Sequence, residues 1–201
     1  MADPVHFYFD FSSPYGYIAG QRIDELAARY GRNVDWRPML LGVIFKETGA
    51  APLTQVPLKG EYSRRDIPRS ARFHGIEDFR LPSPFPIPTQ AAARIVLALK
   101  SRDVALSTTV AKALYRAYFV DHVDISDPDV AAEVAGRAGA DATAMREAVD
   151  DPKVKEALKD AVAQALRAGV CGSPFFVVDG EPFWGLDRFP QLERWLATGG
   201  F

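Results

Sequence analysis

The 201-residue sequence contains a single cysteine, Cys171. One thiol excludes an intramolecular disulfide and a cysteine-rich zinc site. Because a free cysteine is usually a small buried apolar residue, we expect no redox role for it. The three histidines, His6, His74 and His122, lie far apart in the sequence and show no metal-ligand spacing. The sequence therefore predicts no metal site.

The sequence also lacks an excess of basic residues, since 24 lysines and arginines stand against 26 aspartates and glutamates. Binding by phosphate neutralisation needs such an excess, so we expect no nucleic-acid partner. Apolar runs of the ~20 residues that span a bilayer are missing, and we expect no membrane association. The start, MADPVHFYFDF, has neither the basic nor the apolar region of a secretory signal. We expect a cytoplasmic protein.

A β-α-β pattern opens the chain. Residues 5–11, VHFYFDF, are aromatic and β-branched and predict a buried strand. Ser13 then precedes Pro14, as a helix N-cap precedes proline at the first helical position, and apolar residues at helical spacing continue to about Tyr30. Residues 34–37 predict a second strand. Chemistry is expected at the first strand-to-helix turn.

A long helical stretch follows. The loops 49–60 and 81–88, rich in proline or glycine, interrupt it, and apolar residues recur every four positions from Leu106 to Tyr118. Strand patterns are missing between about 60 and 168, so we expect residues 42–169 to form an inserted helical domain. Helix starts are predicted at Thr89, Asp127-Pro128, Asp141 and Asp151-Pro152.

The strand pattern returns near the end of the chain. Residues 172–178, GSPFFVV, predict a strand opened by Pro174, and Asp179-Gly180 predicts a hairpin turn. Residues 182–185 supply the return strand, and a last helix follows. The order is β-α-β, a large all-helical insertion, then β-β-α, which is an α/β fold. Residues 1–41 and 170–201 are expected to form one domain.

Four segments carry a resemblance to a known family: FYFDFSSPY at 7–15, PLKGEY at 57–62, GSP at 172–174 and WGLDR at 184–188. In order and over nearly the whole chain, they resemble segments of 2-hydroxychromene-2-carboxylate isomerases, bacterial relatives of the kappa-class glutathione transferases and of disulfide oxidoreductases with a helical insertion. The resemblance implies a thioredoxin-like fold, glutathione as cofactor, a small aromatic carboxylate as substrate, and a homodimer.

Ser13 is the candidate catalytic residue. Disulfide exchange in this superfamily uses Cys-Pro-x-Cys where this chain has Ser13-Pro14-Tyr15-Gly16, so a thiolate must arrive with a ligand such as glutathione. The helix N-terminus favours an anion, and the Ser13 hydroxyl can add one hydrogen bond to the sulfur. Lowering a thiol pKa by about two units takes roughly 2.7 kcal/mol, which such a bond and the helix dipole can supply. For an arbitrary Ser-Pro, a plain N-cap is the commoner role, and Ser12 is the neighbouring candidate.

The resemblance also implies residues for the rest of glutathione. Ser173-Pro174, expected as a cis peptide bond, would offer the Ser173 backbone to the tripeptide. Leu186, through its backbone, and Asp187 would bind the γ-glutamyl end, and Lys59 would bind the glycyl carboxylate. Each has a plainer interpretation: Pro174 as the start of an edge strand, Asp187 as a helix cap, and Lys59 as solvated surface.

Several positions leave alternatives open. Leu186 and Ala50 replace polar residues that are usual in the family, so each loses one possible contact to glutathione. Tyr15 either belongs to the core or lines the substrate pocket. Four arginines either face a carboxylate substrate or form an exposed helix surface: Arg64, Arg65, Arg69 and Arg72.

We therefore expect a glutathione-dependent isomerase. It would interconvert 2-hydroxychromene-2-carboxylate and trans-o-hydroxybenzylidenepyruvate, or a similar intermediate of aromatic degradation, by thiolate addition, rotation about the resulting single bond, and elimination. One alternative is a kappa-like transferase that conjugates glutathione to electrophiles. The other is a non-enzymatic glutathione- or peptide-binding protein.

Overall fold

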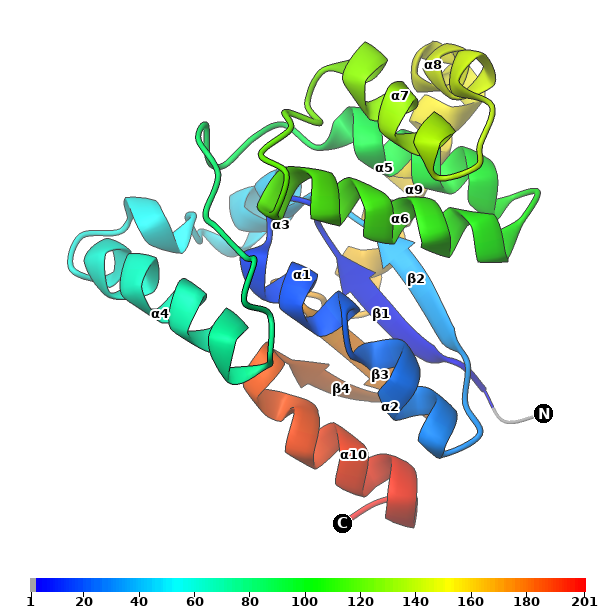
Figure 1. Cartoon of the computed structure of the whole chain (residues 1–201). Coiled ribbons are helices and arrows are strands. Elements are labelled where there is room, and N and C mark those ends of the chain that lie inside the picture. The colour runs from blue at the N-terminus through cyan, green and yellow to red at the C-terminus, as the bar shows by residue number, and fades with distance from the viewer. Residues whose placement is uncertain (1–2) are drawn as a thin grey trace.

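A four-stranded sheet lies at the centre of the computed structural model, which describes residues 3–201 (Figure 1). The strand order is β2-β1-β3-β4. β1 (Val5–Phe9) pairs in parallel with β2 (Val34–Pro38) and antiparallel with β3 (Phe175–Val178). β3 pairs antiparallel with β4 (Glu181–Trp184) across the predicted hairpin turn. The predicted β-α-β and β-β-α halves are confirmed.

Aromatic side chains fix the two faces of the sheet. Phe7 stacks on Phe176 with ring centroids 5.3 Å apart, on the face covered by α1 (Pro14–Gly20), α2 (Ile23–Arg29) and α10 (Phe189–Thr198). Tyr8 points to the opposite face, where it contacts Phe175 and α9 (Pro152–Arg167) covers it. Alternate residues of β1 are thus buried on both sides, which explains its run of apolar residues.

The chain between the two halves is helical, as predicted. Within the described residues no strand occurs between β2 and β3. The predicted caps Asp127, Asp141 and Asp151 each accept a backbone N–H at the start of their helix. None of the helices in residues 3–201 has the length and apolar character needed to cross a membrane. The elements are α3 (Leu41–Thr48), η1 (Leu53–Gln55), α4 (Lys59–Phe73), α5 (Gln90–Lys100), α6 (Val104–Phe119), α7 (Pro128–Arg137), α8 (Ala142–Asp150) and α9; η2 (Leu186–Arg188) follows β4.

Two predicted boundaries are wrong. The single helix expected from Pro14 to about Tyr30 breaks between α1 and α2, directly after Gly20. A Cβ atom at Gly20 would lie 2.8 Å from the Trp36 ring, so the backbone approaches β2 closely there. The first strand ends at Phe9 and not at residue 11, because the Asp10 side chain accepts the Ser12 N–H and turns the chain.

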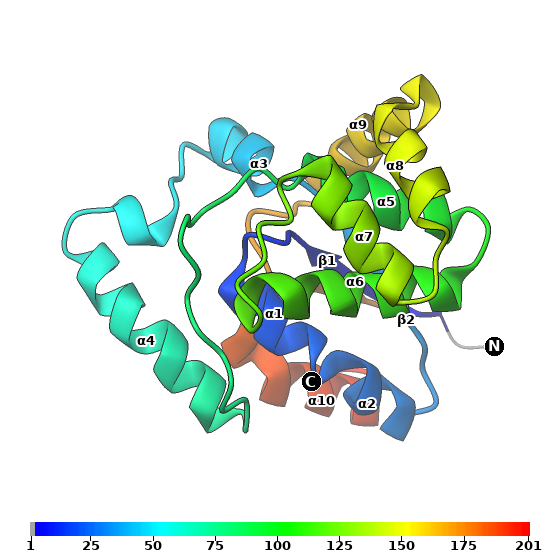
Figure 2. The ribbon, with the colours of Figure 1, turned by 45° about the horizontal axis from the view of Figure 1, so that its top comes forward.

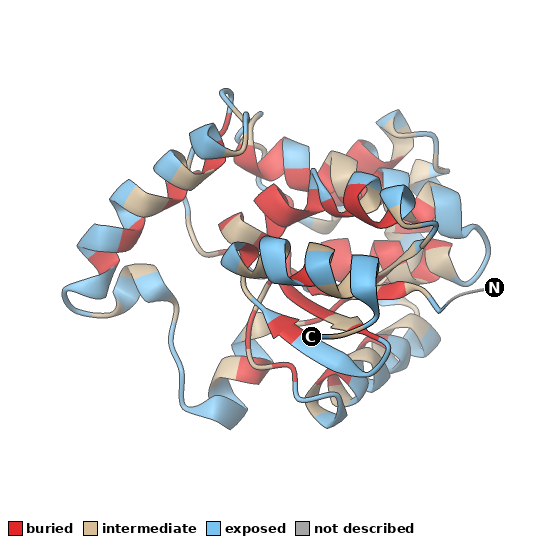
Figure 3. Cartoon of the chain, turned by 90° about the horizontal axis from the view of Figure 1, so that it is seen from below, coloured by how far each residue is buried: buried red, intermediate tan, exposed pale blue. Residues whose placement is uncertain are grey.

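The two predicted domains share one hydrophobic cluster, so their division at residues 42–169 stays a prediction. Phe9 and Phe11 pack against Tyr115 of α6, with ring centroids 5.6 and 4.9 Å apart. Helix α4 lies beside α1, on the side of the molecule away from α7 and α8 (Figure 2). One face of α4 is buried and its outer face is exposed (Figure 3). This placement leaves a groove between α4 and the sheet half.

Candidate functional site

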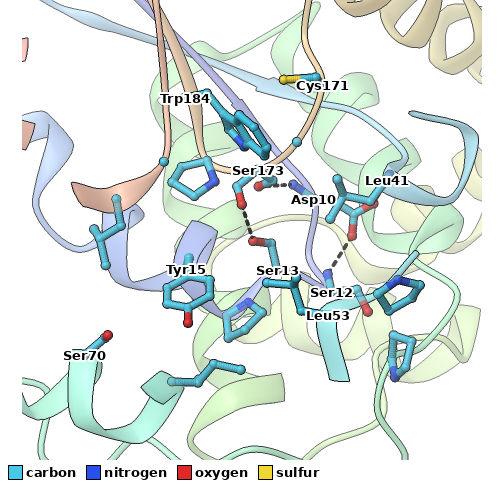
Figure 4. Close-up of a pocket in the computed structure, with 18 of the residues that line it drawn as sticks. Asp10, Ser12, Ser13, Tyr15, Leu41, Leu53, Ser70, Cys171, Ser173 and Trp184 are labelled. Carbon is cyan, nitrogen blue, oxygen red and sulfur yellow. Dashed lines mark hydrogen bonds between the residues drawn. The ribbon is translucent and has the colours of Figure 1, made fainter. Parts of the chain in front are cut away.

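The groove has a volume of about 1520 Å³ and lies between α3, η1 and α4 on one side and the start of α1 and the β4–η2 corner on the other. Figure 4 shows the part around Ser13. The fold brings to this one groove residues as far apart in sequence as Ser13 and Asp187. All six predicted site residues line it: Ser13, Lys59, Ser173, Pro174, Leu186 and Asp187.

Ser13 is the N-cap of α1, as predicted. Its extended backbone (φ -95°, ψ 110°) lets its Oγ accept the Gly16 N–H at 3.0 Å, which places the oxygen at the positive end of the helix. The hydroxyl itself donates to the carbonyl oxygen of Ser173 at 2.9 Å (Figure 4). Ser13 is 3% exposed and lines the groove.

Gly16 stands where Cys-Pro-x-Cys has its second cysteine, and a side chain at this position would clash with its neighbours. A Cβ atom at Gly16 would lie 2.7 Å from the Tyr115 hydroxyl and 2.8 Å from the Ser173 hydroxyl. Real Cβ contacts are not that short, so any side chain here would displace its neighbours. The packing at Gly16 is thus consistent with the absence of both cysteines that dithiol exchange needs at this turn.

The loop opposite Ser13 has the predicted cis peptide bond between Ser173 and Pro174. Beyond it, Leu186 is buried in the hydrophobic cluster, so only its backbone can face a ligand. Asp187 is exposed; its Oδ1 lies over Gly185 and its Oδ2 accepts from Arg188 at 2.9 Å. Gly185 has a φ of 111°, a backbone conformation that suits glycine. The interpretation of Asp187 as a helix cap is wrong, because its side chain caps neither η2 nor α10.

Of the cationic side chains of α4, Lys59 lines the groove and the four predicted arginines do not; Arg22, Arg29 and Arg188 line it from other parts of the chain. Lys59 is the first residue of α4, and Ala50 lines the groove nearby. All four arginines are exposed and none lines the groove, and Arg69 pairs with Asp66 of the same helix at 2.5 Å. The structure thus favours the exposed-surface interpretation for Arg64, Arg65, Arg69 and Arg72.

Tyr15 lines the groove and joins α1 to α4. Its hydroxyl donates to Asp66 at 2.6 Å, and Asp66 also accepts from Tyr62 at 3.2 Å. Burial and the neighbouring carboxylate raise the pKa of Tyr15, so the hydroxyl stays protonated. The bond to Asp66 thus fixes the Tyr15 ring at the wall of the groove.

Asp10 is a site residue that the sequence interpretation missed. Its carboxylate, 3% exposed, accepts from the Ser12 N–H at 2.6 Å, the Leu41 N–H at 2.7 Å and the Thr89 hydroxyl at 3.1 Å. Burial raises the pKa of Asp10 to about 6. The sequence placed Asp10 inside a strand; an acid within an otherwise aromatic strand was the available signal.

Other reactive groups are few. Cys171 also lines the groove, but burial raises the pKa of its thiol, which opposes a thiolate there. In the part of the chain that the structure describes, histidine, cysteine, aspartate and glutamate side chains form no group of three that could hold a metal ion.

Known proteins resemble this chain over almost its whole length. The chain is 29% identical over 199 residues to 2-hydroxychromene-2-carboxylate isomerase of Sphingobium xenophagum, covering 98% of this chain and 99% of that protein. It is 27% identical over 214 residues to glutathione S-transferase kappa 1 of Homo sapiens, covering 96% and 92%. A solved structure of a 2-hydroxychromene-2-carboxylate isomerase has the same fold, with a TM-score of 0.85 at 24% identity over 97% of this chain and 94% of that one.

These similarities confirm the predicted resemblance and the thioredoxin-like fold with its helical insertion. Residues 4–197 match the family described as the DSBA-like thioredoxin domain, which is nearly the whole length of the chain. The chain therefore belongs to the DSBA-like thioredoxin domain family.

Proposed function

We propose that the chain is a glutathione-dependent isomerase that interconverts 2-hydroxychromene-2-carboxylate and trans-o-hydroxybenzylidenepyruvate or a similar intermediate of aromatic degradation. The observation that carries the proposal is the Ser13 oxygen at the N-terminus of α1, opposite cis-Pro174 and with no room for a second cysteine at position 16. Relatives that are isomerases and glutathione transferases support it.

The residues of the groove fit the tripeptide. Lys59 offers a cation for the glycyl carboxylate, and the exposed Asp187 offers a carboxylate for the γ-glutamyl ammonium. Between them, Ser173 offers a backbone carbonyl and Ser13 offers a hydroxyl at a helix N-terminus. These four groups would thus bind the ammonium group, the peptide backbone, the thiolate and the glycyl carboxylate of an extended glutathione.

When bound, glutathione would supply a thiolate that adds to the conjugated carbon, permits rotation and leaves again. The chain would stabilise that anion with the helix N-terminus and with the Ser13 hydroxyl, turned from Ser173 toward the sulfur. Leu41, Phe85 and Ile87 line the same groove and form an apolar surface for a planar ring. The Tyr15 side chain of α1 would contact the substrate ring at one edge.

The test is the isomerisation rate of purified protein with and without glutathione, in the wild type and in Ser13→Ala. Loss of a preorganised donor to a developing or bound anion costs on the order of 100-fold in rate. Ser12→Ala is the matched control, because the Ser12 hydroxyl bonds to the backbone of Ile87 and lies one residue from the proposed site. A rate that is independent of glutathione, or equal in Ser13→Ala and the wild type, contradicts the proposal.

A kappa-like transferase is the second candidate, favoured by the similarity to human glutathione S-transferase kappa 1. The same thiolate would serve, but glutathione would leave attached to an electrophile. Mass spectrometry of the products separates the two reactions. A stable glutathione–substrate conjugate indicates the transferase, whereas unchanged glutathione indicates the isomerase.

The proposal includes a homodimer, as the resemblance implies, and a cytoplasmic location, as expected from the missing secretory signal. Large apolar side chains that are exposed on η1, at the N-cap of α4 and on α4 support association: Leu53, Leu58, Tyr62 and Phe73. Sedimentation equilibrium of the wild type and of Leu58→Glu measures the association, and a monomeric wild type at micromolar concentration contradicts a dimer.

A further inference from the structure

Asp10 holds the Ser13 turn through its backbone as well as its side chain. Its N–H donates to the Ser173 hydroxyl at 3.3 Å. Its carbonyl oxygen accepts two hydrogen bonds of 2.9 Å each, one from the Ser13 N–H and one from the Tyr115 hydroxyl. The carbonyl of Asp10 thus links the proposed thiol site to the helical insertion, because it accepts a hydrogen bond from each.

Tyr115 reaches this point from α6, 105 residues away in sequence. Its side chain is fully buried, and its ring packs against Phe9, Phe11 and Tyr17. The hydroxyl occupies the space beside Gly16, 2.7 Å from where a Cβ would stand. The Asp10 carbonyl is the hydrogen-bond partner of this hydroxyl, and the aromatic rings around it hold the Tyr115 side chain in place.

We propose that Tyr115 is a positioning residue for Ser13, which acts by anchoring the Asp10 carbonyl that also binds the Ser13 N–H. Removing the hydroxyl leaves that carbonyl with one donor and opens a space beside Gly16 into which the turn can move. The Ser13 oxygen would then lose its fixed distance from Ser173. Burial raises the pKa of Tyr115, so its hydroxyl remains a donor throughout the working pH range.

The experiment compares Tyr115→Phe with Ser107→Ala. Tyr115→Phe keeps the ring in its aromatic cage and removes only the hydroxyl. Ser107 is 2% exposed on the same helix, and its hydroxyl donates to the Val96 carbonyl at 2.9 Å, away from the groove. Both changes therefore remove one buried hydroxyl bond between α6 and a backbone carbonyl, but only one of those bonds holds the Ser13 turn.

Amide hydrogen exchange of the protein alone is the first readout. The Ser13 amide should exchange about tenfold faster in Tyr115→Phe than in the wild type, and within about twofold of the wild type in Ser107→Ala. The second readout rests on the proposed function: kcat of the glutathione-dependent reaction should fall about tenfold in Tyr115→Phe with KM for the aromatic substrate nearly unchanged.

Equal Ser13 exchange in the wild type and Tyr115→Phe overturns the positioning role, whatever the activity. Faster exchange in Tyr115→Phe together with equal kcat in the two variants also overturns it, because the turn would then move without affecting the reaction. A wild type that neither binds nor uses glutathione contradicts the proposed function, while hydrogen exchange still decides whether Tyr115 holds the turn.

Discussion

The Ser13 hydroxyl donates a 2.9 Å hydrogen bond to the carbonyl oxygen of Ser173, which lies 160 residues further along the chain. This bond joins the start of α1 to the cis-proline loop across the floor of the groove (Figure 4). A thiolate that takes the Ser13 hydroxyl as donor deprives the Ser173 carbonyl of its partner. A good ligand must therefore bring a thiolate and a replacement N–H together.

Glutathione has such an N–H in its cysteinyl residue. An analogue in which an ester oxygen replaces this N–H should bind about tenfold more weakly, because the half-buried Ser173 carbonyl is left without a donor. Isothermal titration calorimetry of the two ligands measures the difference. Equal affinities would show that the Ser173 carbonyl needs no replacement donor.

Gly16→Ala tests the close packing at the fourth position of the turn. The added Cβ would meet the Tyr115 and Ser173 hydroxyls at 2.7 and 2.8 Å, so the free energy of unfolding should fall by about 1–3 kcal/mol. Gly42→Ala in α3 is the control, since no atom lies within 4 Å of its Cβ position, and it should gain about 0.5–1 kcal/mol from helix propensity. Chemical denaturation measures both; a neutral Gly16→Ala contradicts the packing argument.

Lys59→Ala and Arg65→Ala compare the effect on glutathione binding of a cation that lines the groove with that of a cation on the exposed face of α4. Lys59→Ala should raise the Kd for glutathione about two- to fivefold, more at low ionic strength than at high. Arg65→Ala should leave the Kd unchanged, because Arg65 does not line the groove. The reverse order of effects would place the carboxylate of the ligand on the outer face of α4.

The raised pKa of Asp10 predicts how stability depends on pH. Burial raises this pKa to about 6, whereas an unfolded aspartate titrates near ~3.9. The folded state thus binds the proton more tightly, so the contribution of Asp10 is full below about pH 4 and is lost as pH rises through about 6. The unfolding free energy of the wild type minus that of Asp10→Asn should fall by about 3 kcal/mol from pH 4 to 7. A difference that is constant or rises with pH contradicts the burial of this carboxyl.

Local patterns in the sequence predicted the turns and helix caps of the site but not the long-range hydrogen bonds that hold them in place. The Ser13 cap and the β3–β4 hairpin follow from neighbouring residues, whose preferences act over a few positions, whereas the cis bond before Pro174 was expected from the family resemblance. The bonds from Tyr115 to Asp10 and from Thr89 to Asp10 join residues 105 and 79 positions apart, and no local pattern specifies such pairs. Thr89 illustrates this limit of local prediction. The sequence predicts a helix start at Thr89, and α5 does begin directly after it. Its hydroxyl, however, donates to Asp10 and does not cap the helix.

Ionisation of the bound thiol tests the central claim most directly. We predict that ultraviolet absorbance shows bound glutathione as the thiolate at neutral pH, with a thiol pKa lowered by about two units in the wild type and much less in Ser13→Ala. S-methylglutathione, which has no thiol to ionise, is the control ligand. A bound thiol that titrates at the same pH as free glutathione would contradict the account.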